Sequence, residues 1–231
     1  MKYTIFNKSS ESMNEIKPKS VDIVFFSPPY NIGTYYGSYT DKLKLEKYFN
    51  FMKNVIKECA KTLKKDGRLI IEIADSIFFN NKFIQLAGLI QKYAVVNANM
   101  FLETRHINFI NTKNSFELPN HGFDKNYLTS SNTHSNCHQI LVFNKSKIEY
   151  KTGEILYFNY KHSNEHPCAE PKELIDFIIK KYFRTGMNIL DPFMGTANLG
   201  VSVLKNGGSF SGYEIAEKFY NSAKKKLQSV L

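Results

Sequence analysis

The alternation of short apolar runs with amphipathic segments constrains the fold of this chain more than any other feature of its sequence. Residues 21–26, VDIVFF, form an apolar run rich in β-branched and aromatic residues, typical of a strand buried on both faces. The next segment, 41–67, carries apolar residues at helical spacing and lysines on the other face. Residues 68–74, RLIIEIA, then predict a second strand. This order indicates a βαβ unit and a parallel sheet.

The alternation continues to the end of the chain and predicts an α/β fold, Rossmann-like, with a doubly wound, mostly parallel sheet. Further strands are expected at 94–101, 137–145, 187–191 and 209–215, with a hairpin around Gly153. Further helices are expected at 81–93, 171–183, after the turn at 195–197, and at 216–231. Gly67 suits the end of the first helix, and Pro171 suits the first position of a later one.

One long segment does not follow the alternation. Residues 111–136 are rich in Asn, Ser, Thr and His and show no period. Irregular segments of this length inside a compact domain are usually functional or disordered. The sequence shows no internal repeat, so we expect one domain, residues 1–231, with an insert at about 109–137.

Composition narrows the class of partner. Lys and Arg number 31 against 21 Asp and Glu, which gives a net charge of +10. This excess favours a polyanion, nucleic acid before a membrane, although an ordinary basic surface accounts for it about as well. Three separate cysteines without a C-x-x-C pair suit a reducing cytoplasm. The chain lacks a signal-peptide pattern and an apolar run of roughly 20 residues, so a cytoplasmic protein with no membrane partner is expected.

The sequence DPFMGTANLG, residues 191–200, places a glycine-containing turn between a predicted strand and a predicted helix. Ligands of doubly wound sheets bind outside the carboxyl ends of strands, and Gly195 would allow close approach of the backbone. Glu214 ends the next predicted strand, at a spacing that suits a carboxylate binding ribose hydroxyls. Because the phosphate-binding G-x-G-x-x-G pattern is absent, the pair favours an adenosyl cofactor without phosphates over a dinucleotide. An ordinary turn with a surface glutamate is the alternative, and it accounts for the pair alone about as well.

The first predicted strand runs into Ser27-Pro28-Pro29-Tyr30. Residues before proline are held extended, and proline has no N–H, so the turn is stiff and rich in acceptors. The Ser27 hydroxyl and the Pro28 carbonyl would accept both N–H bonds of an exocyclic amine, and Tyr30 could stack on a flat base. A rigid turn without catalytic function is the alternative.

These motifs together resemble those of DNA amino-methyltransferases, which methylate cytosine N4 or adenine N6. SPPY (27–30) and DPFMG (191–195) look like the family's catalytic and cofactor motifs, and HPCAEPKELI (166–175) looks like its further cofactor-binding segment. The catalytic motif precedes the cofactor motif, and this permuted order resembles the beta group. The resemblance covers nearly the whole chain and implies a Rossmann-like fold of the S-adenosylmethionine-dependent methyltransferase type.

The resemblance also implies roles for individual residues. S-adenosylmethionine would bind at Asp191, Phe193, Gly195, Thr196, Glu214 and His166. Ser27 and Pro28 would hold the amine of a flipped base while Tyr30 stacks on it. In the family, serine at the first position of the catalytic motif goes mostly with cytosine N4, and aspartate mostly with adenine N6. Cytosine N4 is therefore favoured, adenine N6 is the alternative, and an RNA or protein-glutamine N-methyltransferase is more distant.

The sequence departs from the family pattern at two further places. Ala197 stands at the last glycine of the usual Phe-x-Gly-x-Gly, which costs backbone freedom without blocking the site. Near the N-terminus, Lys8 and Ser9 stand where the family often has a Gly-Asp pair that contacts adenine, so that contact is not transferred.

The irregular insert falls where the resemblance places target recognition. Lys113, Asn114, Lys125, Asn126 and Tyr127 are the expected phosphate and base contacts, with solvent exposure as the alternative. The loop 31–42 is a second candidate for closing over a flipped base.

The histidines and the cysteine between 121 and 138 match no closed zinc site, so no metal is expected, and His138 is interpreted as a structural residue at a strand start. The expected partner is double-stranded DNA. A homodimer, and a cognate restriction endonuclease or second methyltransferase, are further partners that the resemblance suggests.

Overall fold

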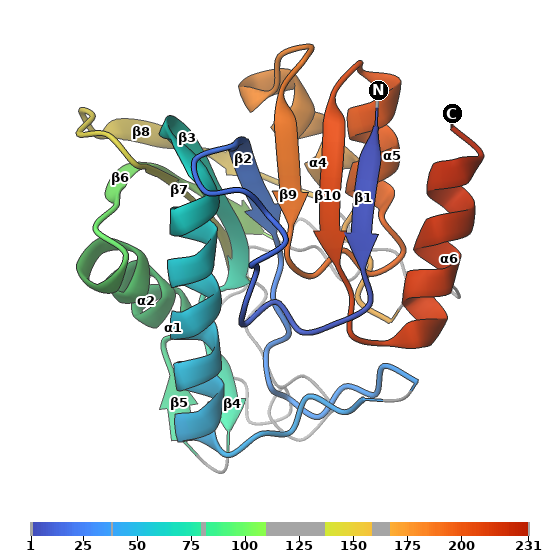
Figure 1. The fold of residues 1–231 in the computed structure, drawn as a ribbon. Coiled ribbons are helices and arrows are strands. Elements are labelled where there is room, and N and C mark those ends of the chain that lie inside the picture. The colour runs from blue at the N-terminus through green and yellow to red at the C-terminus, as the bar shows by residue number, and fades with distance from the viewer. Residues whose placement is uncertain (1, 38, 80–81, 110–136, 159–166, 231) are drawn as a thin grey trace.

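The computed structural model describes residues 2–37, 39–79, 82–109, 137–158 and 167–230. Eight strands form one sheet in the order β1-β10-β9-β2-β3-β7-β6-β8 (Figure 1). Their bounds are β1 Tyr3–Phe6, β2 Val21–Phe26, β3 Leu63–Ala74, β6 Phe101–Phe109, β7 Cys137–Asn144, β8 Lys151–Leu156, β9 Asn188–Asp191 and β10 Ser209–Tyr213. Neighbouring strands are parallel except where β7 pairs with β3 and β6. The expected doubly wound, mostly parallel sheet is confirmed.

Helices cover both faces of the sheet. Within the described residues the α-helices are α1 Leu45–Thr62, α2 Leu86–Lys92, α4 Lys172–Tyr182, α5 Asn198–Lys205 and α6 Glu217–Gln228. Alternate side chains of β2 enter different cores. Val24 and Phe26 pack with α1 and α2, whereas Ile23 and Phe25 pack with α4, α5 and α6. Burial on both faces explains why β2 reads as an apolar run rather than as an alternating one.

The adjacent strands β2 and β9 form the topological switch point. The chain leaves β2 through α1 to reach β3 on one side, and leaves β9 through α5 to reach β10 on the other. These two connecting helices lie on opposite faces of the sheet. The carboxyl ends of β9, β10 and β1 point to the lower edge in Figure 1. Such a point opens a crevice outside the strand ends, where ligands bind.

The predicted strand at 94–101 is wrong. Residues Tyr93–Asn97 extend α2 as one turn of π-helix, and β6 begins only at Phe101. Val95 and Val96 suggested a strand because they are β-branched, yet both are exposed. Helix formation in 81–93 is confirmed only from Leu86, because β4 (Ile77–Phe79) pairs with β5 (Lys82–Ile84) before it.

The expected hairpin around Gly153 is also wrong. Gly153 lies inside β8, which pairs parallel with β6. A Cβ at Gly153 would lie 1.8 Å from the Arg105 carbonyl oxygen, so glycine is required by the close approach of two strands and not by a turn. The first helix ends at Thr62, before Gly67, because Leu63 already has extended backbone and pairs with Val21. The edge strand β1 was not predicted, since three of its four residues are only partly buried and Thr4 is exposed.

No helix in the described ranges has the length and apolar character needed to cross a bilayer. Most of the insert at 109–137, including Lys113, Asn114, Lys125, Asn126 and Tyr127, lies outside the described residues, as does His166.

Candidate active site

The Ser-Pro-Pro-Tyr turn follows the end of β2, and a hydrogen bond to its second proline holds it in place. The Tyr48 hydroxyl of α1 donates to the Pro29 carbonyl at 2.9 Å. Asn31, next to the turn, has a φ of +61°, which asparagine tolerates better than most residues. Its side chain exchanges two hydrogen bonds with the backbone of Leu43, at 2.9 and 2.6 Å. These contacts fix the base of the loop 31–42 to the turn.

Glu72 of β3 is the centre of the half of the site around the Ser-Pro-Pro-Tyr turn. Its carboxylate is fully buried. One oxygen accepts the Ser27 hydroxyl at 2.7 Å and the Tyr30 hydroxyl at 3.1 Å. The other oxygen contacts Nδ1 of His138, and because an ionised carboxylate only accepts, this nitrogen carries the proton. With its proton directed at Glu72, the Ser27 oxygen keeps its lone pairs for another donor.

Tyr30 and His138 complete this cluster. Their rings meet edge to face, with centroids 5.8 Å apart. Burial, followed by the negative charge of Glu72, raises the pKa of Tyr30, so its hydroxyl stays protonated and continues to donate. His138 lies at the start of β7, as the sequence suggested, and is buried against the Glu72 carboxylate beside the Ser-Pro-Pro-Tyr turn.

The second half of the site is the turn between β9 and α5. The Asp191 carboxylate accepts the backbone N–H of Phe193 at 2.9 Å and so shapes the turn. Glu214, after β10, accepts the N–H of Gly195 at 3.1 Å and that of Ala216 at 2.7 Å. Its carboxylate is therefore held in a fixed position. Ala197 has a φ of +59°, the left-handed conformation that explains why the family pattern has glycine there.

Carboxyl groups gather between the two halves. Burial and the charge of Glu72 raise the pKa of Glu170 to about 7. Burial, and then the neighbouring Glu170, raise the pKa of Asp191 well above its usual range. Burial also raises the pKa of Glu214, against the backbone N–H groups that lower it. The backbone of Ser27 lowers the pKa of Glu170 by a smaller amount. A site with this charge favours a cation.

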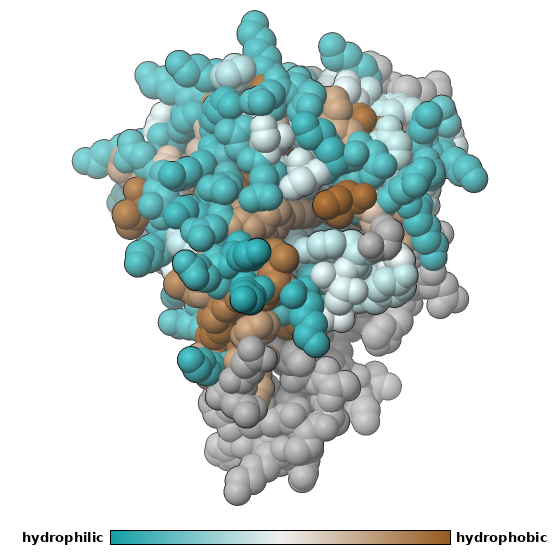
Figure 2. Space-filling model, turned by 60° about the horizontal axis from the view of Figure 1, so that its bottom comes forward, coloured by the Kyte–Doolittle hydropathy of each residue, from teal (hydrophilic) through white to brown (hydrophobic). Residues whose placement is uncertain are grey.

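A small cavity connects the second half of the site with the N-terminal segment. Its volume is about 70 Å³, and it is lined by Lys8, Ser9, Ser10, Pro29, Tyr39, Phe51, Pro192, Phe193, Tyr213, Glu214 and Ile215. Ser10 is 2% exposed, and its hydroxyl has no hydrogen-bond partner among the described residues. Apolar surface shows among hydrophilic residues on this end of the molecule (Figure 2). The segment 8–10, which follows β1, thus supplies polar groups where the family's usual Gly-Asp pair is missing.

The structure brings most of the sequence-predicted site residues together. Ser27, Pro28, Tyr30, Asp191, Phe193, Gly195 and Glu214 lie at the carboxyl ends of β2, β9 and β10. Thr196 is different: it is buried, and its hydroxyl accepts Nζ of Lys226 on α6 at 3.3 Å.

Sequence reasoning missed Glu72, Glu170 and Ser10. Glu72 carried a signal, because it is the one charged residue between Leu69 and Ala74 in a strand otherwise expected to be buried and apolar. Glu170 stands inside the segment HPCAEPKELI, which was itself expected to bind the cofactor, but nothing singled it out within that segment. Ser10 carried no signal, since its neighbours come from distant parts of the chain. In the described part of the chain, no group of three or more His, Cys, Asp or Glu side chains is placed to hold a metal.

A doubly wound sheet with an acceptor turn and a buried carboxylate cluster at its switch point agrees with the Rossmann-like methyltransferase class expected from the motifs. The model of the N6/N4 DNA methylase family matches residues 21–225. The chain belongs to this family of DNA amino-methyltransferases, and the family expected from the motifs is confirmed.

Individual relatives agree with this assignment. The Type II methyltransferase M.HpaI of Haemophilus parainfluenzae is 24% identical, with 97% of this chain and 74% of the relative aligned. The DNA adenine methyltransferase YhdJ of Escherichia coli K12 is 23% identical over 98% of this chain and 82% of its own length.

Solved structures share the fold. The PvuII DNA methyltransferase, which is cytosine-N4-specific, superposes with a TM-score of 0.75 at 14% identity, covering 100% of this chain and 91% of that one. A DNA modification methylase of Thermus thermophilus, solved with S-adenosyl-L-methionine, gives a TM-score of 0.70 at 18% identity, covering 100% and 96%.

Proposed function

We propose that the chain transfers a methyl group from S-adenosylmethionine to the exocyclic amine of a base flipped out of double-stranded DNA, with cytosine N4 as the favoured target. The observation that carries this proposal is the Ser27–Glu72 hydrogen bond at the end of β2. It joins an acceptor turn to a buried negative charge. Flipping is required because the amine is otherwise paired inside the duplex.

The residues of the site fit the cofactor. S-adenosylmethionine supplies a methyl group on a positively charged sulfonium. Asp191, Glu170 and Glu214, whose pKa values are all raised, gain from a cationic neighbour that favours their ionised forms. Glu214 offers remaining lone pairs to ribose hydroxyls, and Phe193 lines the same cavity.

Two features of the cavity refine this proposal. The Ser10 hydroxyl lines this cavity and lacks a protein partner in the described residues, which supports a role for it in binding the adenine end of the cofactor. At about 70 Å³ the cavity is far below the roughly 300 Å³ at which ligand pockets begin. Tyr39 of the loop 31–42 is one of its walls. A nucleoside therefore needs more room than this cavity offers, and Tyr39 is one of the side chains that would have to move to admit it.

At the amine, the turn works as an acceptor with a proton relay behind it. Ser27 Oγ accepts one N–H of the amine while its own proton bonds to Glu72. As positive charge develops on nitrogen, Ser27 takes the amine proton and passes its own to the carboxylate. The Pro28 carbonyl holds the second N–H, and Tyr30 stacks on the base. Fixed dipoles and alignment of the amine supply most of the rate enhancement.

The relay accounts for a serine at the first position of the turn, where other family members have an aspartate. A hydroxyl is a weak acceptor and carries no charge, but Glu72 places a full negative charge one hydrogen bond behind it. Cytosine N4 remains the favoured target through the family's association of serine at this position with that base. Adenine N6 is the second candidate, because a relative aligned over 98% of this chain is a DNA adenine methyltransferase.

The remaining assignments extend the proposal. The chain acts as one domain in the cytoplasm. Its insert at about 109–137 reads a short DNA sequence through Lys113, Asn114, Lys125, Asn126 and Tyr127. A restriction-modification system, with a cognate endonuclease or a second methyltransferase, is its genetic setting, since several relatives are Type II methyltransferases. A homodimer is the assembly we propose.

Transfer of labelled methyl groups tests this function. Purified protein and methyl-labelled S-adenosylmethionine are incubated with unmethylated plasmid, total RNA, or a glutamine-containing protein substrate. Label should enter only the plasmid. Label in RNA or protein alone would overturn the choice of substrate class while keeping the cofactor.

A further inference from the structure

A second and larger cavity lies at the other edge of the sheet. Its volume is about 410 Å³, and it is lined by Arg68, Glu103, Thr104, His106, Lys151, Thr152, Lys181, Tyr182, Arg184 and Met187. Lys151 and Thr152 begin β8, and Arg184 and Met187 precede β9, so the cavity opens near the amino ends of strands. The amino ends of β9 and β10 lie at the upper end in Figure 1, opposite their carboxyl ends. The size is within the range of small-ligand pockets.

The cavity carries excess positive charge. Two of its four cations are paired. Arg68 forms a bidentate ion pair with Glu103, with N–O distances of 2.8 and 3.1 Å, and Lys181 pairs with Glu154. Lys151 and Arg184 have no carboxylate within ion-pair distance in the described part of the chain. An anion that enters would meet two cations whose charge is not already neutralised.

Two hydroxyl groups of the lining are also available as donors. Thr104 is 6% exposed, and its Oγ1 has no hydrogen-bond partner among the described residues. Such a group is costly to bury unless something bonds to it.

The second hydroxyl is that of Tyr182, and its orientation follows from His106. Nδ1 of His106 accepts the backbone N–H of Glu154 at 2.9 Å, so Nε2 carries the ring proton and donates to the Tyr182 oxygen at 2.7 Å. Burial lowers the pKa of His106, which keeps this ring neutral. The Tyr182 proton is therefore left to donate elsewhere.

The local backbone is built to place these groups. Gly153 brings β8 so close to β6 that a Cβ would lie 1.8 Å from the Arg105 carbonyl oxygen. This approach sets Lys151 and Thr152 at the rim of the cavity. On the facing strand, the register shifts between Leu102 and Thr104, and such bulges often re-aim side chains beside ligand sites.

We propose that this cavity binds a small organic phosphate, with Lys151 and Arg184 neutralising the phosphate and Thr104 and Tyr182 donating to its oxygens. A phosphate offers enough acceptor oxygens for four donors, and a volume of 410 Å³ exceeds what the phosphate alone would fill. A nucleoside monophosphate has this chemistry. The site is separate from the methyl-transfer site and does not depend on the proposed function.

Calorimetric titration of the full chain with adenosine and cytidine monophosphates, without S-adenosylmethionine or DNA, tests the proposal. We expect saturable binding of one molecule per chain. Arg184→Gln and Lys151→Gln should each weaken it by about tenfold or more, and Thr104→Val by several-fold, because each removes a donor to a charged group.

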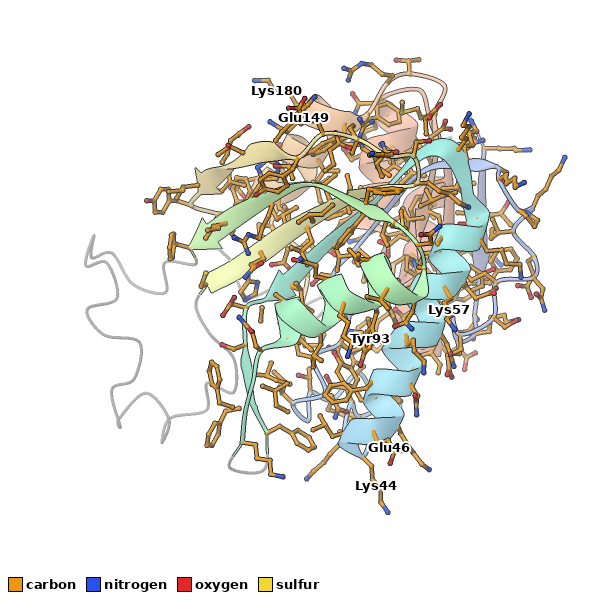
Figure 3. The ribbon with its side chains drawn as sticks, turned by 90° about the vertical axis from the view of Figure 1, so that its left-hand side faces the viewer. Lys44, Glu46, Lys57, Tyr93, Glu149 and Lys180 are labelled. Carbon is orange, nitrogen blue, oxygen red and sulfur yellow. The ribbon has the colours of Figure 1, made fainter. Side chains whose placement is uncertain are left out.

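The matched control is Lys180→Gln, one residue before Lys181 and exposed on α4, which should bind as the wild type does. Figure 3 shows Lys180 at the upper end of the molecule, far from Lys44 at the start of α1. Unchanged melting temperatures would show that the variants are folded. Wild-type protein that does not bind at millimolar concentration, or equal weakening by Lys180→Gln, would overturn the proposal. Displacement of the mononucleotide by a short DNA duplex would also overturn it, by assigning the cavity to the DNA backbone.

Discussion

The substitution Glu72→Gln tests the relay most sharply. The carboxylate accepts three donors, from Ser27, Tyr30 and His138, whereas an amide has one acceptor oxygen and an NH₂ group of nearly the same shape. At least one donor then faces another donor. Hydrogen bonds to charged groups contribute about 1.5–3 kcal/mol each, so we expect a loss of unfolding free energy of about 2 kcal/mol. Relief of repulsion with Glu170 offsets part of this loss.

The catalytic effect should be larger than the effect on stability. Loss of the charge behind Ser27 removes stabilisation of the developing ammonium, and we expect kcat to fall by about 10²–10³. Affinity for S-adenosylmethionine should stay within about twofold, because Glu72 does not line the cofactor cavity. Single-turnover transfer of labelled methyl groups measures the first quantity, and calorimetry measures the second.

A double-mutant cycle separates a relay from a merely structural carboxylate. Ser27→Ala alone should lower kcat by one or more orders of magnitude with cofactor affinity nearly intact. If Glu72 acts through Ser27, the double variant should be little worse than the worse single variant. Effects that multiply would refute the relay, and so would Glu72→Gln turnover within threefold of the wild type. Glu72→Gln should also move the pKa of Glu170 toward its usual range, which carboxyl NMR titration would detect.

Three further predictions concern the cofactor site. Glu214→Ala should weaken S-adenosylmethionine binding by about tenfold or more and lower the melting temperature, since this carboxylate also holds two backbone N–H groups; unchanged affinity would remove the ribose assignment. Ser10→Ala should weaken cofactor binding about three- to tenfold while leaving the melting temperature of the free protein equal or higher, because it deletes a buried hydroxyl with no described partner; a destabilised free protein would argue against this role. Cofactor affinity should rise as the pH increases through about 7, because Glu170 then ionises and its negative charge attracts the cationic cofactor. The rise should be at most roughly tenfold per pH unit for each proton released on binding. Glu170→Gln should flatten it. The free protein should show the opposite trend, because a carboxyl with a raised pKa makes the fold less stable as pH increases from about 4.5 to about 7; calorimetry and thermal unfolding between pH 5 and 8 check both signs.

Much of the fold was predictable because it is encoded locally. The apolar run of β2 and the helical spacing of α1 each report burial within a short window. The errors have a common cause. Val95 and Val96 favour a strand by side-chain type, but the chain continues as a helical turn at the surface. Gly153 looks like a turn residue, yet what requires glycine there is β6, a strand from a distant part of the chain.

The residues of the candidate site likewise fall into those that a local motif reveals and those that only the fold brings in. The turn residues Ser27 and Gly195 stand in contiguous motifs and could be found by reading the chain. Glu72 reaches Ser27 only because β3 pairs with β2, and Ser10 reaches the cofactor cavity only because β1 pairs with β10. Such contacts depend on strand register across the sheet, which no single window of sequence contains.

The measurement that tests the central claim most directly is identification of the methylated nucleoside. Unmethylated plasmid is incubated with the protein and S-adenosylmethionine and hydrolysed, and its nucleosides are separated by mass spectrometry, with Ser27→Ala as the control. We predict N4-methylcytosine with the wild type and at most a trace with the variant. N6-methyladenine would contradict the target base inferred from Ser27, and no methylated base at all would contradict the proposal that this chain methylates DNA.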